Sequence, residues 1–231
     1  MREGRVTVNG RVETALGTKV DPARDEVKVD GRRVRAVERS VYLLLNKPRG
    51  YVSTRRDPQG RKTVLDLVRA RDYVYPVGRL DYDSEGLLLL TNDGELAARL
   101  THPRYEMPRT YEVRVRGVPD PAAIAALARG VVLEGQRTRP VQVRLVRVYK
   151  DGRGPEAVIE IALHEGRNRQ VRRMCEAVGH AVVRLTRVRI GPLVDRSLRP
   201  GQYRPLAQAE VRALQRAVGL TRPDGRGRSH D

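Results

Sequence analysis

The sequence contains little cysteine and few aromatic residues. It has one cysteine, no tryptophan and no phenylalanine in 231 residues, so its nine tyrosines are the only large aromatic side chains. The lone Cys175 excludes a disulfide within the chain, and the four histidines form no Cys/His cluster with the spacing of metal ligands. These absences argue against a disulfide scaffold and a metal site, and they fit a reducing cytoplasm.

Long apolar runs are absent as well. No stretch approaches the roughly 20 residues of a membrane-spanning helix. The residues after Met1, REGRVTVNG, lack the apolar centre of a signal peptide. The sequence therefore predicts a cytoplasmic protein that is neither exported nor held in a membrane.

Negative charge is scarce relative to positive charge. The chain has 46 lysine and arginine residues against 28 aspartate and glutamate residues, a net charge of +18, and only five of the basic residues are lysines. A planar, permanently charged guanidinium suits bidentate contacts with phosphate and stacking on bases. Codon usage would explain the excess of arginine over lysine but not the net charge. We therefore expect a polyanionic partner, RNA or DNA in preference to a membrane surface.

Turn signals divide the first forty residues into two small hairpins. Short alternating segments flank Asn9-Gly10 and Asp30-Gly31, which are dipeptides that favour a tight two-residue turn. The polar character ends near residues 38–40, where VYLLLNKPRGYV begins. We place a domain boundary there, which gives a small domain at 1–38, a main domain at 39–220 and a disordered basic tail at 221–231.

The main domain mixes strand-like and helix-like segments without a regular repeat. Its strands often follow one another or pair through turns, which predicts an α+β fold with a mixed, largely antiparallel central sheet flanked by helices. Helices are expected at residues 66–72 and in ELAARLTH, PAAIAALARG, RNRQVRRMCEAVGH and AQAEVRALQRAVG. Strands are expected in VYLLLNK, YVYPVGRL, LLLLT, RTYEVRVRG, VQVRLVRVY and AVIEIALHE.

Acidic residues surround a run of four leucines in GRLDYDSEGLLLLTNDG, Gly78–Gly94. The leucines predict a buried strand, so Asp81 is expected on a loop at the entrance of that strand. A carboxylate that is partly shielded from water stays ionised at neutral pH only if a fixed cation lies near it. Asp81 is therefore a candidate functional acid, with a plain turn residue as the alternative. Asp83 and Glu85 are interpreted as turn formers with solvated charges.

The segment RNRQVRRMCEAVGH supplies a candidate cation for that acid. At about 100° per residue on a helix, Val171 and Cys175 lie on an apolar seam, and Arg172 lies next to it. Arg169 and Arg173 point away from the seam, toward solvent or phosphate. The helix geometry thus favours Arg172 as the arginine that can reach an internal partner, with a snorkelling surface arginine as the alternative.

Four motifs, in the same order along the chain, resemble those of a known family. The string G-R-L-D, two residues, Ser, one residue, Gly, four leucines, T-N-D-G resembles the signature of the ribosomal pseudouridine synthases of the small-subunit synthase A and large-subunit synthase B group. The segments NKPRGYVST (46–54), RTYEV (109–113) and HEGRNRQVRRM (164–174) resemble the opening, tyrosine and basic motifs of that family. The resemblance implies the pseudouridine synthase fold and spans nearly the whole chain.

The resemblance also implies roles for three residues. Asp81 would open the glycosidic bond of a uridine, either by attacking the ribose or by taking a ribose proton. Tyr111 would stack on the target base and help to remove its C5 proton, whereas without the resemblance a half-buried packing tyrosine would be the better interpretation. Arg172 would pair with Asp81. The reaction exchanges an N-glycosidic for a C-glycosidic bond within one nucleotide, so no cofactor or metal is expected.

A basic rim is expected around the catalytic residues. Arginines are dense from residue 167 to residue 189, as a grip on RNA backbone around a flipped base would require, although a solvated basic face is the alternative for each one. The residues expected to contact RNA are Lys47, Arg49, Arg79, Arg167, Arg169 and Arg173.

The small N-terminal domain has a resemblance of its own. Residues 4–37 resemble the second half of the alpha-L RNA-binding module, which is named after ribosomal protein S four. Family members usually begin with two further helices that complete the module, and these are missing here. A partial alpha-L module is therefore expected at residues 1–38.

The substrate class has alternatives. The large-subunit and small-subunit groups share these motifs, and the general look of LGTKVDPARDEVKVDG and THPRYEMPRTYEV favours 23S over 16S ribosomal RNA. A non-catalytic, ribosome-associated RNA-binding protein is the alternative from another class. A pure binder has no use for a carboxylate directed at a phosphate-rich partner, so Asp81, Tyr111 and Arg172 together favour the enzyme. We expect a monomer that acts on ribosomal RNA, free or within an assembling subunit.

Overall fold

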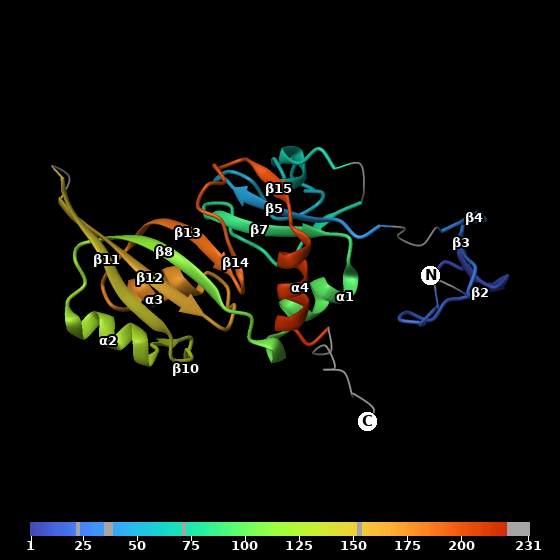
Figure 1. The fold of residues 1–231 in the computed structure, drawn as a ribbon. Helices are drawn as coiled ribbons and strands as arrows, with labels where there is room; N and C mark the ends of the chain where they lie inside the picture. The colour runs from blue at the N-terminus through green and yellow to red at the C-terminus, as the bar shows by residue number, and fades with distance from the viewer. Residues whose placement is uncertain (22–23, 35–38, 71–72, 152–153, 221–231) are drawn as a thin grey trace, which may run out of the picture. The chain divides into compact units, whose positions relative to one another are not determined.

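The computed structural model describes residues 1–21, 24–34, 39–70, 73–151 and 154–220. The chain divides into two units, Met1–Ser40 and Val41–Asp231, which are described separately (Figure 1). The tail expected at residues 221–231 lies outside the described residues.

The first unit contains two β-hairpins, as the turn signals predicted. Its strands pair antiparallel in the order β2-β1-β3-β4. Asn9 and Gly10 have φ angles of 51° and 81°, and Asp30 and Gly31 have φ angles of 50° and 74°, which is the left-handed backbone that a primed two-residue turn requires. The strands are β1 (Val6–Val8), β2 (Arg11–Val12), β3 (Val27–Val29) and β4 (Arg32–Arg33).

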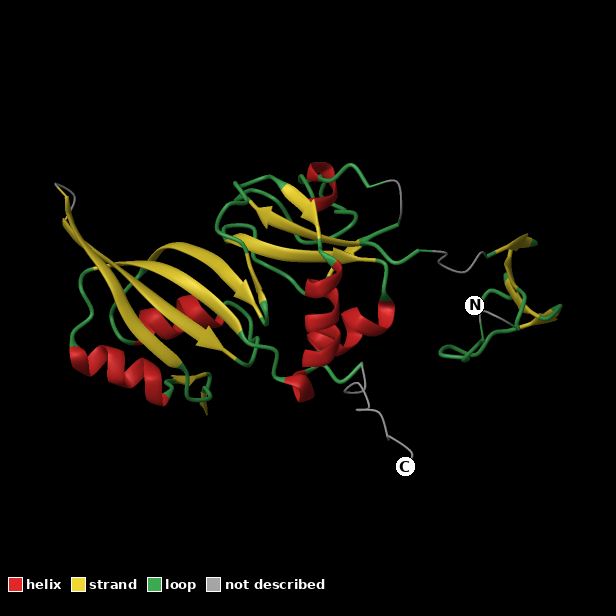
Figure 2. Cartoon of the chain, in the orientation of Figure 1, coloured by secondary structure: helices red, strands yellow, loops and turns green. Residues whose placement is uncertain are grey.

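The second unit is built on a mixed sheet whose described strands follow the order β11-β12-β8-β13-β7-β5-β15 (Figure 2). Strand β14 pairs with β13, β6 pairs with β7, and β9 and β10 form a separate hairpin. All of these pairs are antiparallel except β13 with β7, so the predicted mixed, largely antiparallel sheet is confirmed. The strands are β5 (Tyr42–Lys47), β6 (Tyr75–Pro76), β7 (Glu85–Thr91), β8 (Arg109–Arg116), β9 (Val132–Leu133), β10 (Gln136–Arg137), β11 (Gln142–Asp151), β12 (Gly154–Leu163), β13 (Val182–Ile190), β14 (Leu193–Val194) and β15 (Tyr203–Pro205).

Four predicted helices are present in the second unit, and their ends follow the expected signals. The Asp93 side chain accepts a hydrogen bond from the Leu96 amide at the start of α1, and Asp120 accepts one from the Ala123 amide at the start of α2. Gly130, with φ 85°, ends α2. The α-helices are α1 (Gly94–Thr101), α2 (Pro121–Arg129), α3 (Gln170–Ala177) and α4 (Gln208–Ala217).

The helix predicted at residues 66–72 is wrong in kind and position. A single 3₁₀ turn, η1 (Val64–Leu67), occupies its start, and Val68 is already extended. The Asp66 carboxylate accepts a hydrogen bond from the Thr63 amide at 2.6 Å, which closes the turn locally. A second 3₁₀ turn, η2 (Pro103–Tyr105), follows α1.

Strand β7 explains the run of leucines, because every residue of the strand is buried. Leu87 and Leu89 face a core that includes residues of α1 and α4, whereas Leu88 and Leu90 face a second core on the other side of the sheet. A strand covered on both faces has no need of alternating polar residues.

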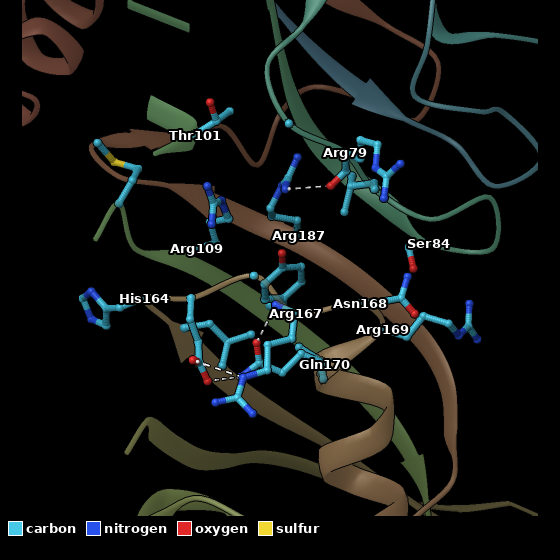
Figure 3. Close-up of a pocket in the computed structure, with 18 of the residues that line it drawn as sticks. Arg79, Ser84, Thr101, Arg109, His164, Arg167, Asn168, Arg169, Gln170 and Arg187 are labelled. Atoms are coloured by element: carbon cyan, nitrogen blue, oxygen red, sulfur yellow. Dashed lines mark hydrogen bonds and ion pairs between the residues drawn. The ribbon is translucent and has the colours of Figure 1, made fainter. Parts of the chain in front are cut away.

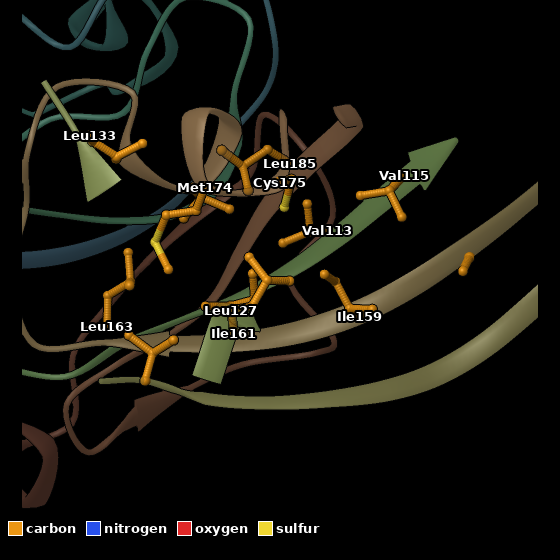
Figure 4. Packing of buried hydrophobic residues seen from close by; sticks show 13 residues of the cluster. Val113, Val115, Leu127, Leu133, Ile159, Ile161, Leu163, Met174, Cys175 and Leu185 are labelled. Atoms are coloured by element: carbon orange, nitrogen blue, oxygen red, sulfur yellow. The ribbon is translucent and has the colours of Figure 1, made fainter. Parts of the chain in front are cut away.

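A third core lies under the other half of the sheet. Side chains of β8, β12 and β13 pack there against α2 and α3 (Figure 4). Met174 and Cys175 of α3 are fully buried in this cluster, so the expectation that Cys175 is a core residue is confirmed. Burial raises the pKa of the Cys175 thiol to about 12. Among the described residues, no helix is both long enough and apolar enough to cross a membrane.

Candidate active site

The loop between Gly78 and β7 carries Asp81, and Lys47 at the end of β5 supports this loop from inside. The ammonium of Lys47 donates to the carbonyl oxygens of Asp81 at 2.9 Å, Ser84 at 2.7 Å and Pro48 at 3.2 Å. Lys47 is fully buried, and this burial lowers its pKa to about 8 although the charge of Asp81 opposes the shift. The prediction that Lys47 belongs to a surface rim for RNA is therefore wrong, because its charge is directed into the protein.

Other residues of the segment NKPRGYVST hold the same loop. The Ser53 hydroxyl donates to the Leu80 carbonyl at 2.8 Å and accepts from the Leu80 amide at 3.1 Å. The Gly50 amide donates to the carbonyl of Tyr82 at 2.8 Å. The segment thus fixes the backbone on both sides of Asp81.

Gly86, at the start of β7, has no side chain and so allows β13 to pack closely against β7 directly after this loop. Arg187 of β13 is its register partner in the parallel pair. A Cβ atom at Gly86 would lie 2.2 Å from the Arg187 carbonyl oxygen and 2.5 Å from its amide nitrogen, and the φ of Gly86 is 111°. Only glycine fits this close approach of the two backbones.

The carboxylate of Asp81 lies half exposed beside Arg169. Nη1 of Arg169 is 3.6 Å from Oδ2 of Asp81, and 36% of the Asp81 side chain is exposed. Arg169 precedes α3 as its N-cap residue and has left-handed backbone angles of φ 47° and ψ 32°. The cation expected near Asp81 is therefore present, but it comes from Arg169.

Arg172 is buried as the helix geometry predicted, but its partner is different. Nη2 of Arg172 lies 3.2 Å from Oδ2 of Asp83 and donates to the Asp83 carbonyl at 3.1 Å and to the Ser84 hydroxyl at 3.4 Å. The predicted ion pair of Arg172 with Asp81 is thus wrong in this structure. Arg172 binds the loop two residues further along.

Asp83 lies in a turn with 41% of its side chain exposed, as the sequence suggested, but it is ion-paired, whereas Glu85 is buried and not the solvated charge that was expected. Nη1 and Nη2 of Arg169 each donate to an oxygen of the Asp83 carboxylate at 3.2 Å. Partial burial raises the pKa of Asp83, but the hydrogen bonds from Arg169 and the charge of Arg172 outweigh it and lower that pKa below its usual value. Glu85 is buried and accepts hydrogen bonds from Arg184 and, at 2.9 Å, from the Thr186 hydroxyl.

A cavity of about 610 Å³ opens beside Asp81, and Tyr111 of β8 lines it as well (Figure 3). The structure therefore brings together the two residues predicted to act on the nucleotide. Six arginines also line the cavity: Arg79, Arg109, Arg139, Arg167, Arg169 and Arg187. Among the described residues, no group of three or more histidine, cysteine or acidic side chains could hold a metal ion.

Three of the arginines predicted to contact RNA line this cavity, namely Arg79, Arg167 and Arg169. Two others do not. Arg49 is exposed and donates to the carbonyls of Asp83 at 3.0 Å and Val183 at 2.8 Å, and Arg173 pairs with Glu134 at 3.0 Å.

Three cavity arginines, Arg109, Arg139 and Arg187, were not identified as site residues from the sequence. Arg109 lies two positions before Tyr111 on β8, so the period of two in a strand places both on one face, and this signal could have found it. Arg187 was counted only within a basic cluster, whereas the structure buries it to 3% exposure. Strand β13, which carries Arg187, was not assigned from the sequence either.

Comparison with known proteins gives one consistent result. Residues 41–177 match the family model for RNA pseudouridylate synthase. Ribosomal large subunit pseudouridine synthase B of Bacillus subtilis is 45% identical over 216 residues, which cover 93% of this chain and 87% of the relative. A protein of the same name in Pseudomonas aeruginosa is 45% identical over 94% of this chain and 57% of its own length. A crystal structure of a pseudouridylate synthase has 32% sequence identity and a TM-score of 0.69, and it covers 92% of this chain and 90% of the other.

Proposed function

The chain belongs to the RNA pseudouridylate synthase family, and on this basis we propose that it isomerises a specific uridine of 23S ribosomal RNA to pseudouridine. The observation that carries the proposal is a single cavity of about 610 Å³ that is lined by Asp81, Tyr111 and several arginines. A carboxylate among cationic side chains suits chemistry on one nucleotide of a polyanion, because the arginines attract the phosphate backbone to the acid.

Large-subunit RNA is favoured over small-subunit RNA by the names of two relatives. The proteins of Bacillus subtilis and Pseudomonas aeruginosa that are 45% identical to this chain are both called ribosomal large subunit pseudouridine synthase B. The same chemistry on 16S ribosomal RNA is the alternative. A binding protein without catalysis is disfavoured, because the Asp81 carboxylate would then only repel phosphate.

The reaction is an isomerisation, so the nucleotide neither gains nor loses an atom overall. The bond between N1 of uracil and C1′ of ribose breaks, the base turns, and a bond forms between C5 and C1′, while the C5 proton is lost and N1 gains a proton. Asp81 acts at the ribose, either by attacking C1′ or by taking a ribose proton, and both routes need its ionised carboxylate. Tyr111 lies across the base and takes part in removing the C5 proton.

The arginines near Asp81 have different proposed roles. Arg169 forms an ion pair with Asp81 at 3.6 Å and so orients its carboxylate. Arg172, which is buried, acts as a positioning residue that fixes the loop by donating to the Asp83 carbonyl and to the Ser84 hydroxyl. Arg79 and Arg167 bind phosphates at the mouth of the cavity.

The remaining expectations follow from this function. We propose that the enzyme is a monomer of the cytoplasm, where ribosomal RNA is made and assembled, and that it needs no cofactor. We propose that residues 1–38 form a partial alpha-L module.

The test is to incubate the purified protein with unmodified large-subunit and small-subunit ribosomal RNA and to map pseudouridine on each. We expect product at one uridine of the large-subunit RNA, and none with Asp81→Asn. Product on the small-subunit RNA alone would overturn the choice of substrate. Product on neither RNA, or undiminished product from Asp81→Asn, would overturn the proposed function.

A further inference from the structure

Arg187 lines the catalytic cavity and is a buried cation with one guanidinium nitrogen that has no partner among the described residues. Only 3% of the residue is exposed. Its Nε donates to the Leu87 carbonyl at 2.7 Å and its Nη1 donates to the Arg79 carbonyl at 3.5 Å, as the dashed line in Figure 3 shows. Nη2 is buried and has no hydrogen-bond partner among the described residues. Two nitrogens of the guanidinium therefore hold it in place, while the third is buried without a partner.

Arg109 lies beside Arg187 on the neighbouring strand. Its Nη2 donates to the Leu100 carbonyl at 3.3 Å, and it also lines the cavity. Burial lowers the pKa of Arg109, and the positive charge of Arg187 lowers it further, so the two cations repel each other. Within the part of the chain that the structure describes, no carboxylate lies within 4.0 Å of either guanidinium.

A buried cation beside a half-buried cation, without a counterion, is unfavourable, because each loses hydration and neither gains an opposite charge. A ligand that supplies a negative charge would relieve both costs. A neutral carbonyl of the base would satisfy the free donor of Arg187 but would leave the repulsion between the guanidinium groups in place. The pair is therefore suited to an anion with several acceptor oxygens.

We propose that Arg109 and Arg187, which both line the catalytic cavity, form a phosphate subsite in which their guanidinium groups bind a phosphate of the nucleotide that undergoes reaction. The inference rests on the proposed function in one respect, namely that this nucleotide is a uridine. The subsite fixes the ribose between the phosphate and the Asp81 carboxylate, which distinguishes it from the arginines that hold RNA at the rim.

The experiment measures the binding of uridine, uridine 5′-monophosphate and uridine 3′-monophosphate to the full chain by NMR titration. We expect at least one of the monophosphates to bind about tenfold more tightly than uridine, because its phosphate accepts charge-assisted hydrogen bonds that uridine cannot accept. The Arg187→Met and Arg109→Met variants are each expected to bind the monophosphates no more tightly than uridine. Arg212→Met is the matched control, because Arg212 is exposed on α4, and it should behave as the wild type.

Loss of the Leu87 contact could unfold Arg187→Met, and the Arg109→Met variant then provides the same test on a residue that makes a different backbone contact. A wild-type protein that binds both monophosphates no better than uridine would overturn the subsite, and so would a folded variant that keeps the full preference. A protein that shows the arginine-dependent preference but makes no pseudouridine would support the subsite and overturn the proposed function.

Discussion

Replacing Lys47 with methionine tests how the Asp81 loop is supported. Methionine keeps much of the apolar stem but removes the ammonium, so the carbonyl oxygens of Pro48, Asp81 and Ser84 lose a donor that lies 2.7–3.2 Å away. A buried polar group without a partner costs about 1–3 kcal/mol. Because the buried ammonium is itself unfavourable, we expect a net decrease of about 2–4 kcal/mol in the free energy of unfolding at neutral pH.

The pH dependence of this difference follows from the pKa of Lys47. Burial lowers that pKa from 10.5 to about 8 in the folded protein, so between these values the unfolded chain holds more protons on this side chain than the folded chain does. The free energy of unfolding rises with pH wherever the unfolded state binds more protons. The wild type is therefore expected to gain stability relative to Lys47→Met across this window, by up to about 3 kcal/mol.

Urea unfolding of both proteins at about pH 7.5 and about pH 10 measures the effect, and the other titrating groups cancel in the difference between them. A difference that stays constant to within about 0.5 kcal/mol would refute the burial of a charged Lys47 under the loop. A difference that shrinks as the pH rises would refute it as well, because the sign would be reversed.

Three other substitutions or treatments test separate features. Gly86→Ala is expected to lower the free energy of unfolding by about 3 kcal/mol or more, because its Cβ would lie 2.2 Å from the Arg187 carbonyl oxygen at a φ of 111°, and a loss below about 1 kcal/mol in urea unfolding would contradict this. Arg172→Met should reduce single-turnover rates about a hundredfold with little change in RNA affinity, and equal losses in both measurements would make it a phosphate contact instead. Burial raises the pKa of Cys175 to about 12, so iodoacetamide should label it only after unfolding, and rapid labelling of the folded protein would count against its place in the core.

The elements that the sequence predicted well depend on local patterns. The two hairpins follow from Asn9-Gly10 and Asp30-Gly31, whose backbones take the left-handed angles of a tight turn. The buried strand follows from an uninterrupted run of four leucines, and the inward position of Arg172 follows from the helical period of its own segment. Each of these predictions needs only neighbours in the chain.

The features that the sequence did not predict depend on contacts between segments that are distant in the chain. The helical wheel placed Arg169 away from the acid, but Arg169 lies before the helix in a left-handed conformation, so the angle of 100° per residue does not apply to it. The burial of Lys47 requires a loop 34 residues further along the chain. The pairing of β13 with β7, which places Arg187 in the cavity wall, joins segments about one hundred residues apart, and no local pattern specifies it.

The central claim is that Asp81, and not its neighbour Asp83, is the carboxylate that reacts. Asp81→Asn and Asp83→Asn remove the same charge from the same loop with almost no change in shape, so each is the control for the other. The measurement is the rate of pseudouridine formation on large-subunit ribosomal RNA with enzyme in excess. We expect no product above background from Asp81→Asn, and a rate within about tenfold of the wild type from Asp83→Asn. Product from Asp81→Asn at the wild-type rate, or loss of product from Asp83→Asn alone, would contradict the account.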